Sequence, residues 1–178
     1  PTDPGVDPTK NAETFARYGN APYLNRDFFA RLARALPDAM VVELASRHGF
    51  PIACAVSLRG GDKLFGRYWG ASVDYHSLHF ELCYYRGIEY CIREGLARFE
   101  PGTQGEHKLL RGFIPAPVWS MHEIADARFA GAIGAWLARE RARRRAWLRA
   151  AVRHLPFRPA EIPARLPDDV RDCMAAED

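Results

Sequence analysis

The chain has 178 residues, enough for one domain with a sizeable core, and its 48% hydrophobic and 26% charged residues are typical of a globular protein. Its net charge of +3 is too small to indicate a nucleic-acid partner, which would need a local basic patch. The cysteines form no CxxC pair, and the sequence shows neither an apolar run that could cross a bilayer nor a signal peptide. These features predict a cytoplasmic, reducing location.

The first part of the chain predicts a linker followed by two helices. Residues 1–10, PTDPGVDPTK, are rich in proline and aspartate and read as a linker. A short helix is expected over Ala12–Tyr18. Asn25 is placed to cap a second helix over Arg26–Leu36, where apolar residues recur at helical spacing.

Three strands are expected next, joined by the turn signals HGFP and Gly60-Gly61. On the middle strand the larger side chains and the small ones alternate, so that Ala53, Ala55 and Ser57 form a small face suited to close packing of a helix or another sheet layer. The short connections predict an antiparallel meander. The predicted strands are Ala39–Arg47, Ile52–Leu58 and Lys63–Trp69.

The second half alternates helical and extended patterns. A helix over Phe80–Gly95 is expected to bury a stripe of Leu82, Tyr85, Ile88, Ile92 and Leu96. The further predicted elements are a strand at Ala97–Glu100, a helical turn at Glu106–Arg111, a strand around Pro117–Ile124 and a long helix over Ala125–His154. Residues 155–178 read as a proline-rich acidic tail, extended and partly disordered. The order predicts an α+β domain over 11–154, or an α/β one if later strands add in parallel.

Several sequence segments carry a family resemblance. The segments KLFGRYWGAS, HFELCYYRGIEYCIREGLARFEPGTQGEHKLLRGFIP and WSMHEI resemble the bacterial peptidoglycan biosynthesis/recognition proteins, a FemAB-like family related to the Fem-type aminoacyltransferases. The layout is similar to the GNAT acyl-CoA N-acyltransferase fold, an α/β sandwich in which a meander is crossed by a helix. The resemblance implies an N-acyltransferase that moves an acyl or aminoacyl group from acyl-CoA or aminoacyl-tRNA to an amine, such as that of a peptidoglycan precursor.

The sequence departs from these relatives in two ways. The junction GASVDYHSLHF lacks the Q/R-x-x-G-x-G/A loop with which ordinary GNAT enzymes hold a pyrophosphate. The family's proteins also look like two tandem lobes, of which this chain resembles the second. An N-terminal lobe or a second copy is therefore an expected partner. The aromatic strand Lys63–Trp69 could pair across a dimer, or equally it could lie buried beside another strand. A non-catalytic recognition lobe remains the alternative to an enzyme.

The segment after the short strand concentrates the groups that acyl transfer needs. Gln104, Glu106, His107 and Lys108 supply a base, an acid and donors for an oxyanion, and Gly105 lets the backbone approach a ligand. The alternative is a solvated polar turn in which Glu106 interacts with the helix dipole. The expected catalytic residues are Glu106, His107, Glu81 and Glu100, and the expected substrate-binding residues are Gln104, Lys108, Gly105, Tyr85 and Arg111.

Two of these candidates lie on the Phe80–Gly95 helix. Glu81, Tyr85 and Glu89 are four residues apart and share a side of the helix, where they could line a cleft or form a solvated flank. Glu100 ends a short strand, where it could act in the site or cap a turn. His76, His79 and Cys83 have spacing compatible with metal ligation, but no second cysteine is near and we predict no metal.

The last predicted helix is rich in arginine. Two tryptophans, Trp136 and Trp147, lie among the arginines, and Glu140 is the only acid between Arg139 and Arg153. A tRNA or an anionic membrane surface is a possible partner of the Arg139–Arg153 helix. The alternative is a solvated face on which arginine stems cover the tryptophans. The arginines are Arg139, Arg141, Arg143, Arg144, Arg145, Arg149 and Arg153.

Overall fold

A computed structural model describes residues 24–102 and 105–176 of the chain. The chain divides into two compact units, Pro1–Thr103 (unit 1) and Gln104–Asp178 (unit 2). The predicted linker over 1–10 and the predicted helix over Ala12–Tyr18 lie outside the described residues. The single domain expected over 11–154 stays a prediction.

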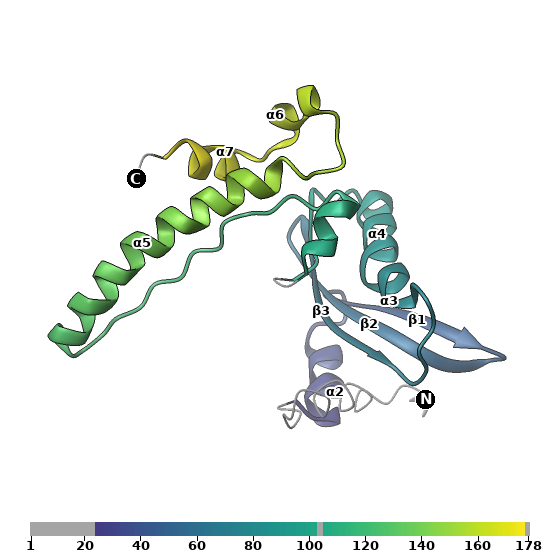
Figure 1. Ribbon diagram of the computed structural model, residues 1–178. Coiled ribbons are helices and arrows are strands. Elements are labelled where there is room, and N and C mark those ends of the chain that lie inside the picture. The colour runs from purple at the N-terminus through teal and green to yellow at the C-terminus, as the bar shows by residue number, and fades with distance from the viewer. Residues whose placement is uncertain (1–23, 103–104, 177–178) are drawn as a thin grey trace. The chain divides into compact units, whose positions relative to one another are not determined.

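Unit 1 is built on a four-stranded sheet with the order β1-β2-β3-β4. The first three strands form the predicted antiparallel meander, and β4 adds to β3 in parallel, as in the α/β form of the prediction (Figure 1). Because β3 lies between β2 and β4, its backbone along residues 63–65 is already paired and cannot join a dimer there. The strands are β1 (Met40–Arg47), β2 (Phe50–Gly60), β3 (Lys63–Ala71) and β4 (Arg98–Glu100).

Both hairpin turns use left-handed backbone. His48 and Gly49, with φ of 51° and 82°, join β1 to β2 as the HGFP signal predicts. The second turn lies one residue later than predicted, because Gly60 still pairs with Lys63 and the loop is Gly61-Asp62. Gly61 has a φ of 58°, which glycine adopts without a Cβ clash.

A helix precedes the sheet and another crosses it. The helix α2 (Arg26–Ala35) begins after Asn25, whose Oδ1 accepts a hydrogen bond from Phe28 N at 2.9 Å, which confirms the predicted cap. The crossing helix consists of α3 (Leu78–Phe80), a π-helical segment η2 (Glu81–Tyr85) and α4 (Arg86–Glu94). It ends at Gly95, whose φ is 65°.

The predicted buried stripe of the crossing helix is partly wrong. Tyr85 is 44% exposed and Ile92 is 77% exposed. Leu82 is buried as predicted, and the other buried positions of the helix are Tyr84, Gly87 and Cys91. The prediction was based on 3.6 residues per turn along the whole helix. In the structure the amide of Arg86 donates to Glu81 O in a π-type turn, and the wider turn rotates the side chains that follow. The small face of β2 is used as predicted, since Ala53 and Ala55 are buried with Leu82.

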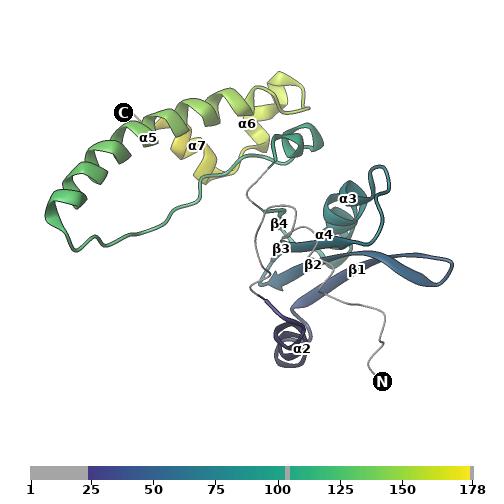
Figure 2. The ribbon, with the colours of Figure 1, turned by 60° about the horizontal axis from the view of Figure 1, so that its bottom comes forward.

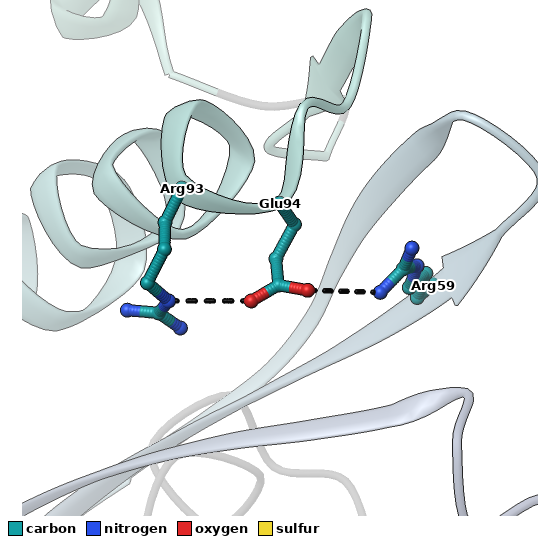
Figure 3. Close-up of polar contacts among 3 residues, drawn as sticks. All are labelled: Arg59, Arg93 and Glu94. Atoms are coloured by element: carbon teal, nitrogen blue, oxygen red, sulfur yellow. Dashed lines mark hydrogen bonds and ion pairs between the residues drawn. The ribbon is translucent and has the colours of Figure 1, made fainter.

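A carboxylate at the end of α4 ties this helix to the sheet. One oxygen of Glu94, Oε2, accepts a hydrogen bond from Arg59 Nη1 of β2 at 3.3 Å, and the other, Oε1, accepts one from Arg93 Nε at 3.2 Å (Figure 3). The chain then turns into β4, and Ala97 N donates to Asp62 O at 2.8 Å. These contacts place the start of β4 beside the start of β3.

Unit 2 is helical. The predicted helical turn is present as the 3₁₀ segment η3 (Glu106–Arg111), and the predicted long helix is α5 (Ala127–Val152). Asp126 caps α5, because its Oδ1 accepts hydrogen bonds from Arg128 N at 2.9 Å and Phe129 N at 3.0 Å. The strand predicted around Pro117–Ile124 is wrong: residues 113–124 form an irregular extended segment, and α5 runs back beside it (Figures 1 and 2).

The expectation of an extended tail is also wrong for the described residues up to 176. They form η4 (Pro159–Glu161), α6 (Ile162–Arg165) and α7 (Asp168–Ala175). Pro159 and Pro163 occupy first turns, where a missing N–H is tolerated, so these prolines begin helices instead of excluding them. The core of unit 2 consists of Leu148, Val152, Leu155, Leu166 and Val170.

Candidate functional site

The π-helical segment η2 exposes two of the predicted site residues. Glu81 and Tyr85 both point to solvent, while Leu82 and Tyr84 between them are buried. Neither the Glu81 carboxylate nor the Tyr85 hydroxyl forms a hydrogen bond or ion pair with the described residues, so both are available to a ligand. A π-type turn within an α-helix is frequently found at functional sites.

Glu100 has a structural contact as well as a position at a strand end. Its Oε1 lies 3.7 Å from Lys63 Nζ, across the parallel pair of β4 and β3. Both side chains are well exposed, so the ion pair contributes little to stability. Within the described part of unit 1, no hydrogen bond or ion pair joins Glu100 to Glu81.

The pairing of β3 with β4 stops early, and among the described residues no other strand pairs with this side of β3 beyond Phe65. The last paired residues are Phe65 and Glu100. Pro101 follows Glu100 and has no N–H to continue the ladder, and its Cα lies so close to Gly66 that a Cβ there would stand 3.4 Å away. Beyond Phe65, β3 continues to Ala71 paired with β2, after a bulge at Arg67. A strand edge of this kind can accept a ligand that carries amide groups.

Aromatic rings surround His79 near the end of β3. Its ring stands edge-on to Trp69 at 5.3 Å, to Tyr84 at 5.4 Å and to Phe80 at 5.5 Å, measured between ring centroids. His79 therefore packs as part of an aromatic cluster. Among the described residues, no group of histidine, cysteine and acidic side chains is placed to hold a metal ion.

The polar turn predicted as the site is anchored in unit 2. Glu106, His107, Lys108 and Arg111 all lie on η3, and Leu109 of the same turn packs against the α5–α7 core. Gly105 precedes the turn with a φ of 103°, and a Cβ there would lie 2.3 Å from His107 Cε1. The His107 carbonyl accepts a hydrogen bond from Arg111 Nη1 at 2.9 Å, which stiffens the turn.

These observations bring part of the predicted site together. Gly105, Glu106, His107, Lys108 and Arg111 share one turn, and the Glu106 carboxylate is exposed and forms no ion pair with the described residues. Gln104 lies outside the described residues. The convergence of this turn with Glu81, Tyr85 and Glu100 of unit 1 stays a prediction.

Some features near the candidate residues were missed from the sequence. Arg86 follows η2 directly and bridges two acids, with Nε 3.7 Å from Glu43 Oε2 and Nη1 2.6 Å from Glu89 Oε2. Only the second partner has a sequence signal, its i,i+3 spacing. The early end of the β3–β4 ladder could have been predicted from Pro101, because proline has no N–H to extend the pairing. Burial raises the pKa of the Cys91 thiol, which keeps this group protonated and unsuited to act as a nucleophile.

The arginine-rich helix α5 divides into structural and exposed parts. Arg149 Nη1 donates to Met174 O at 2.8 Å and so holds α7 in place, and Arg144 pairs with Glu140 at 2.7 Å. Arg139, Arg141 and Arg143 are exposed and form no ion pair with the described residues. No helix in the described part of the chain has the length and apolar character needed to cross a membrane.

Comparison with known protein families gives the same family as the sequence segments that resemble the peptidoglycan biosynthesis/recognition proteins. A protein-family model described as peptidoglycan biosynthesis/recognition, FemAB-like, matches residues 10–159. No curated protein and no solved structure matches the chain. Because the family model covers well over half of the sequence and includes both η2 and η3, the chain belongs to the FemAB-like family of peptidoglycan biosynthesis/recognition proteins.

Proposed function

We propose that this chain is the acyl-transferring domain of a peptidoglycan-modifying enzyme, which moves an acyl or aminoacyl group to an amine of a peptidoglycan precursor. Membership of the FemAB-like family supports a role in peptidoglycan biosynthesis or recognition. The order of unit 1, an antiparallel meander, a crossing helix and a parallel strand, supports a GNAT-like acyltransferase arrangement. The observation that carries the proposal is the early end of the β3–β4 ladder at Phe65 and Glu100.

The edge of β3 beyond Phe65 is the proposed donor site. A pantetheine arm or an aminoacyl group presents amide or amine groups that can hydrogen-bond to a strand edge, as an added strand does. The exposed Glu81 and Tyr85 lie on the helix that crosses the same sheet. The junction after β3 lacks a glycine-rich pyrophosphate loop, so an aminoacyl-tRNA is the preferred donor and acyl-CoA the second candidate.

The proposed reaction removes two protons from the acceptor nitrogen, one before and one after the C–N bond forms, and delivers one proton to the leaving group. The acceptor ammonium loses its proton to a base, and the free amine attacks the donor carbonyl carbon. The C–N bond forms and the C–O bond to the tRNA (or the C–S bond to coenzyme A) breaks. The attacking nitrogen loses its second proton, and the leaving oxygen or sulfur takes up one proton. Glu106 or His107 is the proposed base, with Glu81 and Glu100 as further acid–base candidates. Lys108 is the proposed contact for an anionic group of the substrate.

Hydrogen exchange tests the donor site separately from turnover. Addition of aminoacyl-tRNA or of coenzyme A should slow exchange of the backbone amides in residues 66–71, because a ligand on the edge shields or bonds them. The amides of β1 serve as the internal control and should not change. Protection that appears elsewhere, with residues 66–71 unaffected by every donor, would exclude the β3 edge as the donor site.

A further inference from the structure

Exposed apolar side chains collect on one part of unit 2, which we call the arm. The arm consists of residues 113–147, the extended segment after η3 together with the first part of α5, which lies beside it (Figures 1 and 2). Met121 is 99% exposed and Trp119 is 73% exposed. Several large apolar side chains exposed within one segment indicate an interaction surface. The exposed apolar residues of the arm are Val118, Trp119, Met121, Phe129, Trp136 and Trp147.

The α5 part of the arm is also cationic. Phe129, Trp136, Arg143 and Trp147 share one face of α5, because they are separated by seven, seven and four residues. Arg139 lies three residues after Trp136 and flanks this face. Arg139 and Arg143 form no ion pair with the described residues, whereas the single acid of α5, Glu140, is already paired with Arg144. Exposed tryptophan side chains favour an apolar partner, and arginines without an ion pair favour negative charge. The arm therefore suits a partner with an apolar interior and a negatively charged surface.

We propose that the arm binds the surface of an anionic lipid bilayer. The aromatic and methionine side chains would lie at the boundary between headgroups and acyl chains, which tryptophan favours. Arg139 and Arg143 would lie among the lipid phosphates, where each basic residue strengthens binding. This binding needs neither donor nor acceptor and is independent of the proposed transfer reaction.

Two other partners fit the arm less well. RNA would use the arginines and could stack bases on tryptophan, but Val118 and Met121, the two most exposed apolar residues of the arm, offer no ring for stacking. A second copy paired face to face would bring Arg139 and Arg143 close to the same residues of its partner, where like charges repel. In an anionic bilayer the acyl chains can contact the aliphatic side chains of the arm, and the headgroups can pair with its arginines.

Tryptophan fluorescence of the full chain can test the proposal directly. Three of the four tryptophans lie on the arm, and the fourth, Trp69, packs against His79 in unit 1. Vesicles of phosphatidylcholine with phosphatidylglycerol should shift the emission to shorter wavelength, and brominated acyl chains should quench it. Vesicles of phosphatidylcholine alone should bind more weakly, and salt should reduce binding to the anionic ones.

Paired variants distinguish binding through the arm from the general effect of removing any exposed charge or apolar side chain. Trp119→Ser/Met121→Ser and Arg139→Gln/Arg143→Gln should each lower vesicle partitioning, measured by sedimentation, by on the order of tenfold. The matched controls are Ile92→Ser, an exposed apolar residue of α4, and Arg26→Gln/Arg31→Gln, which removes the same charge from α2; both should bind as the unmodified chain does.

Three results would overturn the proposal. The first is the absence of binding to anionic vesicles. The second is binding that the arm variants leave unchanged. The third is a different partner on the arm. That partner would be RNA if the chain binds RNA tightly but does not bind vesicles. It would be a second copy if ultracentrifugation shows self-association that Trp119→Ser/Met121→Ser abolishes and vesicles do not bind.

Discussion

Gly87 of α4 lies directly against the ring of Phe99 on β4, so closely that a Cβ on Gly87 would stand 2.5 Å from Phe99 Cζ. Real Cβ atoms essentially never approach a neighbour so closely. This contact lets the crossing helix lie close to the short parallel strand β4, which pairs with β3. The edge of β3, at which we propose donor binding, begins where that strand ends.

Gly87→Ala should therefore destabilise unit 1. Displacement of the Phe99 ring costs about 1–3 kcal/mol, which exceeds the gain of about 1 kcal/mol in helix propensity. Gly131→Ala on α5 is the matched control, since nothing lies within 4 Å of a Cβ there, and it should be neutral or stabilising. Urea unfolding of both variants gives the comparison. Equal stabilisation by the two substitutions would show that Phe99 does not restrict this position.

Val170→Ala should loosen the turn that carries Glu106 and His107. Val170 is fully buried in the core of unit 2, and Leu109 of η3 packs against the same cluster. Loss of the two methyl groups should cost about 2 kcal/mol and speed amide exchange in η3, with little change in unit 1. Asp172→Ala, on an exposed position of the same helix, is the control. Unchanged exchange in η3 would contradict this coupling.

Glu94→Gln should have only a small effect on stability. The carboxylate contacts Arg59 and Arg93, but about a third of each of the Glu94 and Arg59 side chains is exposed, so solvent and salt weaken the interaction. We expect a loss of at most about 1 kcal/mol at low salt, falling further at 1 M salt. Thermal unfolding at two salt concentrations measures it. A large loss that salt does not reduce would contradict a solvent-screened pair.

Cys91 should resist alkylation in the folded protein. Burial raises the pKa of its thiol above the unfolded value, so the folded state keeps its proton at a pH where the unfolded state loses it. The associated stability is therefore present below the unfolded pKa and is lost as pH rises above it. Peptide mapping after iodoacetamide treatment near pH 8 should show Cys91 protected in the native chain and modified in urea. Equal modification in both conditions would contradict the burial.

Local patterns predicted much of the fold. The Asn25 cap, the antiparallel meander, the helical turn at Glu106–Arg111 and the long helix all follow from short-range signals and are confirmed. These elements depend on capping side chains, period-two alternation and glycine turns, which lie within a few residues of one another.

The errors came from features that short-range patterns do not encode. The π-type turn at Glu81–Tyr85 changed which residues the helix buries, and no periodic count predicts it. The segment after Leu155 was expected to be extended because of its prolines, yet Val170 and Leu166 fold back onto α5. Of the candidate site, the sequence predicted the polar turn η3, whereas the early end of the β3–β4 ladder depends on a pairing between distant residues.

The measurement that tests the central proposal most directly is transfer itself. The purified chain, an aminoacyl-tRNA and a UDP-linked muropeptide are mixed without vesicles, and the mass of the muropeptide is followed. We expect a gain of one aminoacyl residue, slowed at least tenfold by Glu106→Gln or by His107→Ala if the respective residue is the base. Glu123→Gln, an exposed acid of the same unit, should have no effect. A muropeptide that binds but never gains mass, with aminoacyl-tRNA or acyl-CoA, would contradict the transferase proposal and indicate a recognition domain.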